Sequence, residues 1–277
     1  MSQPANPSAP VPGTIALIGA GVMGETILSG LIRSGRPVES LSVGEKNPER
    51  AAELQERYGV AVVSNLDAVE GAATVALVVK PQDMGDVLAE IAPALGAGQL
   101  VVSLAAGVTT AFIESRVPSG VAVARAMPNT PALVDRGMAA ISPGSACAEE
   151  QLAEAESLLS AVGAVVRVPE KQQDAVTAVS GSGPAYVFLV AEAMIEAGVH
   201  LGLARPTAHQ LAVETLLGAA TMLQQTGDHP AVLRERVTSP AGTTAAALRQ
   251  LEVHGLRAAF LAALEAARDR SVELAGS

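Results

Sequence analysis

The stretch TIALIGAGVMGETILSGLIRSG, residues 14–35, decides the fold of this chain. It opens with a short apolar run that ends in glycine, which is typical of a buried strand. Apolar residues then recur at helical spacing, at Ile27, Leu28, Leu31 and Ile32. The sequence therefore predicts a strand that passes through a glycine-rich turn directly into a helix.

The turn, GAGVMG at 19–24, matches G-x-G-x-x-G, the pattern of dinucleotide-binding loops. The first glycine allows the tight turn, the second lets the backbone approach a pyrophosphate, and the third lets helix and strand pack closely. Free N–H groups at the helix start then bind phosphate. A plain tight turn is the alternative, but the flanking strand and helix favour a nicotinamide-cofactor loop made of Gly19, Ala20, Gly21, Val22, Met23 and Gly24.

Strands and helices continue to alternate on the carboxyl side of this loop. Further short apolar runs predict strands at 41–43, 60–63, 74–79, 100–104 and 164–168. Amphipathic patterns predict helices at 48–59 and 149–163. Alternation of this kind implies a parallel sheet covered by helices on both faces, so residues 13–168 are expected to form a Rossmann domain of the α/β class.

The pattern changes at about Pro169. From there to residue 277 the sequence predicts helices without intervening strands, so residues 169–277 are expected to form an all-helical second domain. The segment 185–201 is apolar on almost every face, which predicts burial inside the domain or against another subunit. We therefore expect a homodimer or higher homo-oligomer through these helices. Residues 1–12, rich in Pro and Ser, are expected to be a disordered tail.

The composition limits the possible partners. Of 277 residues only 2% are aromatic, with no Trp, so the cores must consist of Ala, Val and Leu. The net charge of −10 and the lack of stacking rings argue against binding to nucleic acid. No apolar run approaches the roughly 18 residues of a membrane span, and no signal peptide is apparent at the N-terminus. A cytoplasmic protein is expected.

No metal site is expected either. Cys147 is the only cysteine, which excludes an intrachain disulfide and a thiolate cluster. The four histidines are scattered at no recognised ligand spacing, and Glu192 and Glu196 look like a solvated helix edge.

The choice between NADH and NADPH stays open at this point. Glu45 lies 21 positions beyond Gly24, where an acid accepts hydrogen bonds from the ribose 2′-hydroxyl and favours NAD. Lys46, Asn47 and Arg50 follow at once and can instead hold a 2′-phosphate. A solvated loop is the third alternative.

Several segments together resemble pyrroline-5-carboxylate reductase. They are the GAGVMG loop, VVKPQ (78–82), VVSLAAGV (101–108), RAMPNTPALV (125–134), SGSGPAYVF (180–188) and HPAVLRERVTSPAGTTAAALRQLE (229–252). They occur in the family's order and cover nearly the whole chain. The resemblance implies a Rossmann domain, a helical dimerisation domain and reduction of 1-pyrroline-5-carboxylate to L-proline by NADPH or NADH. One departure is Ala241, where the family's final motif has glycine, which matters if the position needs a positive φ.

The resemblance and the loop positions together assign the cofactor residues beyond the glycine loop. Lys80 ends a strand at the carboxyl edge of the sheet, where it can donate to a phosphate or ribose or be an ordinary solvated lysine. The family pattern adds the neighbouring loops, so the expected contacts are Asn47, Asn65, Val79, Lys80, Pro81, Ala105, Ala106 and Gly107.

The substrate is expected to bind at TSPAGTT, 238–244, where small residues precede a helix and leave N–H groups for a carboxylate. The resemblance assigns Thr244 to the ring nitrogen, as the catalytic residue; a pair of N-caps at Thr243 and Thr244 is the structural alternative. Asn129 can face the substrate or hold its turn, and Ser182 can cap a helix or sit at a carboxylate-binding helix start. The expected substrate contacts are Thr243, Gly242, Glu170, Asn129 and Ser182.

The chemistry asks little of side chains, because a protonated cyclic imine is already an electrophile and positioning supplies most of the acceleration. Two alternatives stand beside this function. A related imine reductase or hydroxyacid-type dehydrogenase is one, although the lysine common in the interdomain helix of the latter is absent from 180–200. A non-catalytic nicotinamide-sensing protein is the other.

Overall fold

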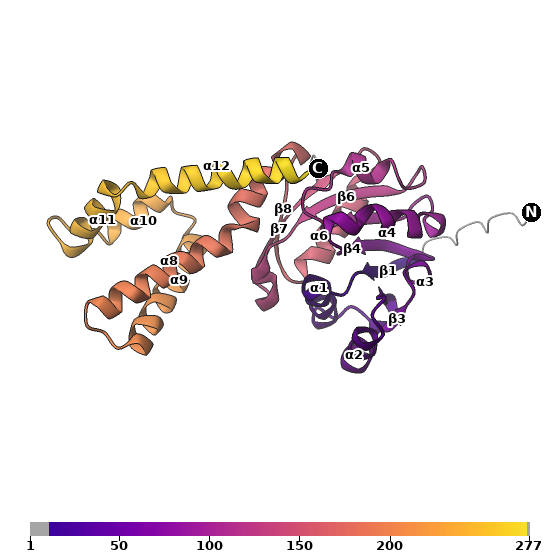
Figure 1. The fold of residues 1–277 in the computed structure, drawn as a ribbon, viewed down its shortest axis with the longest axis horizontal. Helices are drawn as coiled ribbons and strands as arrows, with labels where there is room; N and C mark the ends of the chain where they lie inside the picture. Colours follow the sequence, from indigo (N-terminus) through magenta and orange to yellow (C-terminus); the bar gives the residue numbers. More distant parts are fainter. Residues whose placement is uncertain (1–10, 276–277) are drawn as a thin grey trace, which may run out of the picture. The chain divides into compact units, whose positions relative to one another are not determined.

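The computed structural model describes residues 11–275, and the chain divides into two compact units (Figure 1). The first extends to Ser182 and takes up the chain again from Ala267, and the second is Gly183–Ala266. The first unit thus extends past residue 168. The domain boundary that we expect between residues 168 and 169 stays a prediction. The expected tail lies outside the described residues up to position 10, and the first strand begins at Val11.

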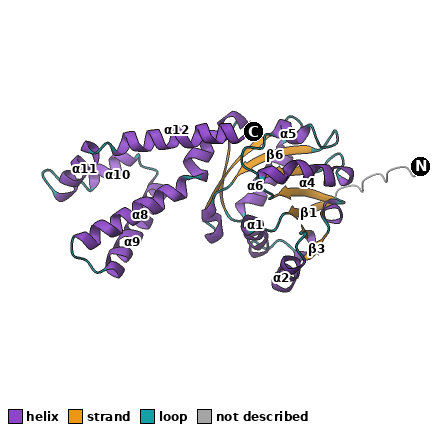
Figure 2. Cartoon of the chain, viewed as in Figure 1, coloured by secondary structure: helices purple, strands orange, loops and turns teal. Residues whose placement is uncertain are grey.

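One eight-stranded sheet forms the centre of the first unit (Figure 2). Its spatial order is β3-β2-β1-β4-β5-β6-β7-β8. The strands β2 and β3 are thus added on one side of β1, and the strands from β4 onward on the other side. This change in strand order confirms the Rossmann prediction, because it is the topological switch point of such folds. Ligands bind there, at the carboxyl ends of the strands. The strands are β1 (Val11–Ile18), β2 (Leu41–Gly44), β3 (Ala61–Val63), β4 (Ala72–Leu77), β5 (Leu100–Ser103), β6 (Ala122–Met127), β7 (Gly137–Pro143) and β8 (Gly163–Arg167).

Two strands were not predicted from the sequence, β6 and β7. They pair antiparallel to each other, whereas every other neighbouring pair is parallel, so the expectation of an all-parallel sheet is wrong at this point. The reason is visible in β6, where Arg125 interrupts the apolar run and hides the strand pattern. Arg125 is nevertheless 4% exposed, because Glu170, distant in sequence, lies 3.5 Å from its Nη1.

Helices cover both faces of the sheet, as predicted. Alternate residues of β1 point to opposite faces: Ile15 and Leu17 pack with one set of helices, Ala16 and Ile18 with the other. The first set is α1 (Val22–Arg33), α2 (Pro48–Tyr58) and α6 (Glu149–Ser160). The second is α3 (Asn65–Val69), α4 (Met84–Ile91) and α5 (Thr110–Glu114).

The cores of the first unit are aliphatic, as the composition requires. Among the described residues the buried apolar side chains are Ile, Leu, Val, Ala and Met, without an aromatic ring. Small side chains permit close contacts, as at Gly163, where a Cβ would collide with the backbone of Gly137. Close backbone approach, rather than large rings, therefore fills the space between elements.

The remaining chain is helical throughout, as predicted (Figure 2). A short helix, α7 (Gln173–Val176), leads through a π-helical turn (Thr177–Gly181) to the second unit. The later helices are α8 (Gly183–His200), α9 (Arg205–Thr226), α10 (Pro230–Arg236), α11 (Thr243–Val253) and α12 (Leu256–Ala275).

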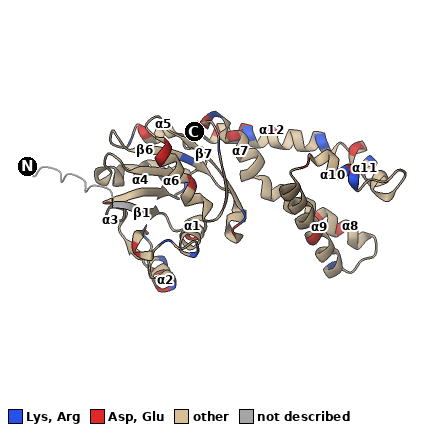
Figure 3. Cartoon of the chain, turned by 180° about the vertical axis from the view of Figure 1, so that it is seen from behind, with Lys and Arg blue, Asp and Glu red and all other residues tan. Residues whose placement is uncertain are grey.

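The helix α8 exposes its apolar residues in the single chain. Phe188 is 67% exposed and Leu189 is 65% exposed, and most of α8 carries no charge (Figure 3). The helical stretch Glu170–His200 is long and apolar enough to cross a membrane by length and composition alone, and 11% of its most apolar window is buried. This run is longer than the sequence analysis predicts, since no apolar stretch of membrane-spanning length was expected.

Candidate active site

The carboxyl ends of five strands form one edge of the sheet in the first unit. Residue pairing places Gly44, Ile18, Leu77, Ser103 and Arg125 in one row. Hydrogen bonds extend the row by a residue: the Val78 N–H donates to the Ile18 carbonyl (2.8 Å), and the Leu104 N–H to the Leu77 carbonyl (3.0 Å). The loops that follow these strands, which carry most of the predicted cofactor residues, are therefore neighbours.

The three glycines of the loop after β1 differ in what surrounds them. Gly19 has φ +94°, and a Cβ there would lie 2.7 Å from the Val78 carbonyl oxygen. A Cβ at Gly24 would collide with the Gly19 carbonyl oxygen, whereas one at Gly21 would meet nothing within 4 Å. Gly19 and Gly24 thus hold the turn together, and Gly21 leaves open the space that a pyrophosphate would occupy.

The start of α1 is free to bind an anion. Its N-cap is Gly21, and no side chain caps the first N–H groups. These groups and the helix dipole attract negative charge. The geometry of the loop is therefore compatible with a dinucleotide, and the individual cofactor contacts of Gly19–Gly24 stay predictions.

The next two loops along the edge are built from small residues and a proline. Gly107 has φ +76°, Ala105 is buried, and Ala106 is exposed. Lys80 is exposed and precedes a short 3₁₀ turn that begins at Pro81, while the Val79 side chain lies against Gly19. The loops lie at the carboxyl edge of the sheet, where open α/β folds bind ligands, and their contacts with the nicotinamide and its ribose stay predictions.

A corner of polar residues follows β2. Glu45 accepts hydrogen bonds from the Ala20 N–H (3.3 Å) and the Asn47 N–H (2.8 Å). Asn47 is the N-cap of α2, and its Oδ1 accepts from the N–H groups of Glu49 (2.9 Å) and Arg50 (3.2 Å). The corner is thus tied directly to the glycine loop.

Ion pairs connect this corner to α1, and α2 carries both basic and acidic side chains (Figure 3). Arg50 pairs with Glu25 and with Glu53 (2.6 Å), and Arg57 pairs with Glu25 (2.7 Å). Tyr58 donates to Glu25 as well (2.8 Å). Hydrogen bonding from Arg50 is the main reason that the pKa of Glu25 lies below its ordinary value.

Asn65 and Lys46 converge on one acid. Asn65, 5% exposed, donates from Nδ2 to Glu90 (3.1 Å), and the Lys46 ammonium lies 2.8 Å from the same carboxylate oxygen. Hydrogen bonding from Lys46 is the main reason that the pKa of Glu90 is lowered. Asn65 therefore joins the start of α3 to α4, and its cofactor contact stays a prediction.

Glu170 holds two elements of the first unit together. Its carboxylate accepts from the Thr110 N–H (2.7 Å) and the Thr110 hydroxyl (2.7 Å), and it lies near Arg125. Thr110 and Arg125 were not predicted as partners of Glu170, because Thr110 lies 60 positions from Glu170 and Arg125 lies in β6, another distant segment. The structure gives Glu170 a structural role, and its contact with substrate stays a prediction.

The amide of Asn129 is used within its loop. Its Oδ1 accepts from the Met138 N–H (2.8 Å), and its Nδ2 donates to the Ser180 carbonyl (3.2 Å) and hydroxyl (3.1 Å). Of the two alternatives for Asn129, the geometry favours the one in which it holds the turn.

Ser182 does not cap a helix start. It has helical backbone angles, φ −85° and ψ −17°, and its N–H donates to the Thr177 carbonyl (2.8 Å). A capping serine has extended backbone, so that alternative is wrong. Its contact with substrate stays a prediction.

The TSPAGTT loop belongs to the second unit. The N-cap of α11 is Gly242, without a side-chain cap, so Thr243 and Thr244 form the first turn instead of capping it. The N–H groups of this turn are consequently open to a carboxylate. Ala241 has φ +55°, which confirms that the position needs the left-handed region that glycine prefers.

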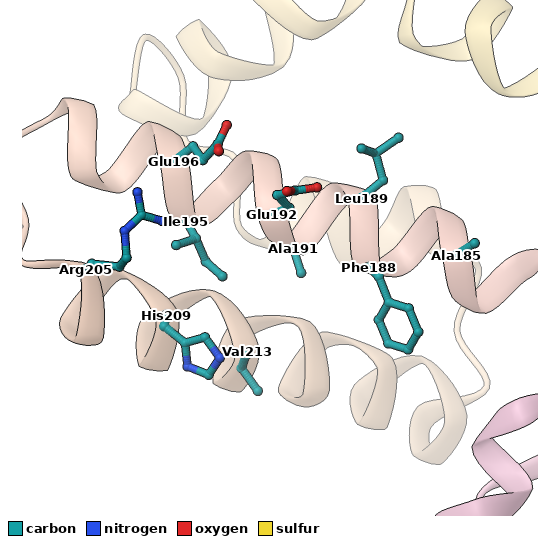
Figure 4. Close-up of a pocket in the computed structure, with 10 residues that line it drawn as sticks. All are labelled: Ala185, Phe188, Leu189, Ala191, Glu192, Ile195, Glu196, Arg205, His209 and Val213. Atoms are coloured by element: carbon teal, nitrogen blue, oxygen red, sulfur yellow. The ribbon is translucent and has the colours of Figure 1, made fainter.

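A groove of about 720 Å³ lies between α8 and α9 (Figure 4). Phe188, Ile195 and Val213 give it an apolar floor, and Glu192, Glu196, Arg205 and His209 line its edge. It contains none of the predicted site residues. Among the described residues, no group of three or more His, Cys, Asp or Glu side chains could hold a metal ion.

Two family models match the chain. The model described as pyrroline-5-carboxylate reductase dimerisation matches residues 170–274, and one described as NADP oxidoreductase, coenzyme F420-dependent, matches residues 14–107. The second covers the cofactor loops from β1 to Gly107. The first covers all of the helical unit, including the TSPAGTT loop.

Curated relatives and solved structures agree with these matches. A pyrroline-5-carboxylate reductase from Corynebacterium melassecola is 49% identical over 94% of this chain and 98% of its own. One from Mycobacterium tuberculosis is 47% identical over 94% and 96%. The solved reductase from Coxiella burnetii is 39% identical, with a TM-score of 0.91 over 94% and 98% of the two chains. The NADP-bound reductase from Plasmodium falciparum is 28% identical, with a TM-score of 0.84 over 95% and 98%.

Proposed function

The chain belongs to the pyrroline-5-carboxylate reductase family, and from this premise we propose how its residues carry out the reaction. The enzyme reduces 1-pyrroline-5-carboxylate to L-proline with NAD(P)H. The observation that carries the mechanism is the pair of uncapped helix starts, at α1 in the first unit and at α11 in the second.

We assign the cofactor to the sheet edge of the first unit. The N–H groups of the α1 turn bind the pyrophosphate, with Gly21 leaving room for it. Val79, Lys80 and the small residues Ala105–Gly107 line the nicotinamide end. Bound there, the nicotinamide supplies the hydride that the imine carbon receives.

We assign the substrate to the start of α11. The carboxylate of 1-pyrroline-5-carboxylate accepts hydrogen bonds from the open N–H groups of Thr243 and Thr244. The Thr244 hydroxyl contacts the ring nitrogen, as the family resemblance implies. The residues orient an iminium carbon that is already electrophilic, so the acceleration comes from positioning. Asn129, Glu170 and Ser182 remain proposed contacts in the first unit.

The protein is a homo-oligomer. We propose that a second copy covers the exposed apolar face of α8 and occupies the groove between α8 and α9, giving a homodimer or a higher assembly of dimers. The exposed Phe188 and Leu189 support this proposal, since a second copy buries them without a membrane. Binding to nucleic acid or a membrane is not part of the proposal, and a cytoplasmic location stays a prediction.

One assay tests the function. The purified protein is mixed with NADH or NADPH and 1-pyrroline-5-carboxylate, the loss of reduced cofactor is followed, and proline is identified as the product. We expect stoichiometric proline. A folded protein that binds cofactor but yields no proline would refute the assignment and favour a sensing role.

A second experiment tests the substrate site. We expect Thr244→Ala to lower kcat/KM by about tenfold to hundredfold, because the ring loses a positioning contact, while cofactor affinity changes little. Thr221→Ala is the matched control, since it removes a hydroxyl that bonds the Leu217 carbonyl within α9. Equal kinetics for wild type and Thr244→Ala would remove Thr244 from its role.

A further inference from the structure

We infer that the corner after β2 makes this enzyme select NADH over NADPH, with Glu45 as the residue that determines the selectivity. The inference rests on the proposed function, because it concerns the adenosine ribose of the same cofactor. The Rossmann unit accommodates either cofactor, and the side chains after its second strand decide between a 2′-hydroxyl and a 2′-phosphate.

The position of Glu45 is set by backbone contacts from two loops. One carboxylate oxygen accepts from the Ala20 N–H inside the glycine loop, at 3.3 Å. The other accepts from the Asn47 N–H, at 2.8 Å. Gly44 pairs with Ile18 at the end of β1, so the carboxylate stands beside the loop that binds the pyrophosphate.

This arrangement suits a ribose diol. A carboxylate oxygen offers about two lone pairs, so each oxygen of Glu45 can accept a further hydrogen bond beyond the one it has. The ribose 2′-hydroxyl is a donor and matches this acceptor. A 2′-phosphate carries no such donor and brings a negative charge of about −1.5 to −2 toward the carboxylate.

A 2′-phosphate would need a free cation, and the cations of this corner are already paired. The Lys46 ammonium lies 2.8 Å from the Glu90 carboxylate. Arg50 uses all three of its nitrogen positions: Nε donates to the Ala20 carbonyl (3.1 Å), Nη1 to Glu53 (2.6 Å), and Nη2 to Glu25. A bound phosphate would therefore have to share these cations with the carboxylates that they already hold, and it would also face the negative charge of Glu45.

Three other groups in the region, Arg57, Lys80 and Asn47, do not provide a free cation for a 2′-phosphate. Arg57 is bound to Glu25 and Glu53. Lys80 follows β4, which lies on the opposite side of β1 from β2. The Asn47 side-chain oxygen is occupied by the first turn of α2. The corner thus contains an acceptor for a hydroxyl and four carboxylates, of Glu25, Glu45, Glu53 and Glu90, against Lys46, Arg50 and Arg57.

Direct binding measures the selectivity without turnover. The chain contains no Trp, so the fluorescence of reduced nicotinamide can be followed against a weak protein background. We expect wild-type protein to bind NADH at least about tenfold more tightly than NADPH. The 2′-hydroxyl of NADH donates a hydrogen bond to Glu45, whereas the 2′-phosphate of NADPH is repelled by it. AMP should displace NADH at lower concentration than adenosine 2′,5′-bisphosphate, which differs from it only by the 2′-phosphate.

Glu45→Gln removes the charge and keeps the shape. We expect it to weaken NADH binding and to reduce the preference for NADH over NADPH by about tenfold. Glu49→Gln, on the exposed first turn of α2, is the matched control, because it removes the same charge a few residues away and should leave the ratio unchanged.

Wild-type protein that binds NADPH as tightly as NADH would overturn the inference, as would an unchanged ratio in a folded Glu45→Gln. The nucleotide competition on wild-type protein decides the matter even if the variant does not fold. Turnover of 1-pyrroline-5-carboxylate with a preference for NADPH would sink this inference and leave the function intact. If the protein bound NADH more tightly than NADPH but produced no proline, the proposed function would be refuted and the inferred selectivity would stand.

Discussion

The two units of the chain differ in how they bury apolar residues. In the first, two aliphatic clusters on either face of the sheet contain side chains that are almost fully buried. In the second, residues 183–266, Ala208 and Ala212 are the only buried apolar residues, while Phe188, Leu189 and Leu261 are each more than 60% exposed. The Rossmann unit thus closes its own core, whereas the helical unit leaves large apolar side chains exposed, and these are the residues that we propose a second copy of the chain covers.

The largest expected effect is on the stability of the first unit, at Gly24, where the backbone of the glycine loop is closely packed. Gly24→Ala should lower the free energy of unfolding by about 3 kcal/mol, because the new Cβ collides with the Gly19 carbonyl oxygen and the backbone must shift. Thermal and denaturant unfolding measure the change.

Gly21→Ala is the control for this substitution. Its Cβ would meet nothing within 4 Å, so the loss of stability should be limited to the roughly 1 kcal/mol that alanine costs at an N-cap, while cofactor binding weakens because the methyl enters the pyrophosphate space. Equal stability losses in the two variants would contradict the different roles of the two glycines.

The next effect tests whether the second unit depends on its partner. Phe188→Glu should raise the dissociation constant of the oligomer by about thirtyfold or more, because about 2 kcal/mol of apolar burial is lost and a charge is placed in the interface. Analytical ultracentrifugation over a range of concentrations measures it. Leu133→Glu, which changes an exposed leucine of the first unit, should leave the assembly as it is. An intact oligomer of Phe188→Glu would place the interface elsewhere.

A smaller effect concerns the charge network behind the cofactor corner. Glu25→Gln should destabilise the protein at neutral pH by about 1–2 kcal/mol, because the acceptor shared by Arg50, Arg57 and Tyr58 loses its charge and one of its two oxygens. Glu53→Gln, at a more exposed carboxylate, should cost about 0.5 kcal/mol or less.

The pH dependence follows from the lowered pKa of Glu25. A carboxylate whose pKa is lower in the folded state adds stability above its unfolded pKa and loses it as the pH falls through the folded value. The stability gap between wild type and Glu25→Gln should therefore be full at neutral pH and close in acid. A gap that stays constant into strong acid would show that the charge is not its source.

The smallest effect concerns one loop of the helical unit. Ala241→Gly should raise the free energy of unfolding by up to about 1 kcal/mol, because the residue has φ +55° and glycine adopts that region without strain. Ala246→Gly, inside α11, should lower it by about 1 kcal/mol. If Ala241→Gly destabilised the protein as Ala246→Gly does, strain at position 241 would be disproved. The oligomeric state should not change in either variant.

Much of the first unit could be predicted from local patterns. The glycine loop, the strands β1 to β5 and the helices α1, α2 and α6 were recognised because each has its own apolar periodicity or turn residues. The strands β6 and β7 were missed. In β6 the buried Arg125 breaks the pattern, and it is tolerated only because Glu170 pairs with it across the fold.

The candidate site likewise combines features that local patterns predicted with features that depend on contacts between distant segments. The sequence identified the loops that line the sheet edge, since each follows a recognisable strand. It left Asn129 and the cofactor corner with open alternatives, because those depend on hydrogen bonds between segments far apart in the chain. The Asn129 amide bonds Ser180 and Met138, and Glu45 bonds Ala20, contacts that no local pattern contains.

The sequence by itself determined the α/β class, the glycine loop, the aliphatic cores and the family, because these depend on residue type and spacing along the chain. Only the tertiary structure decided which polar groups are already satisfied, that Lys46 and Arg50 are paired, that position 241 is left-handed, and that α8 is exposed in a single chain. The physical reason is that periodicity is local, whereas hydrogen-bond partners and burial are set by residues brought together from distant parts of the chain.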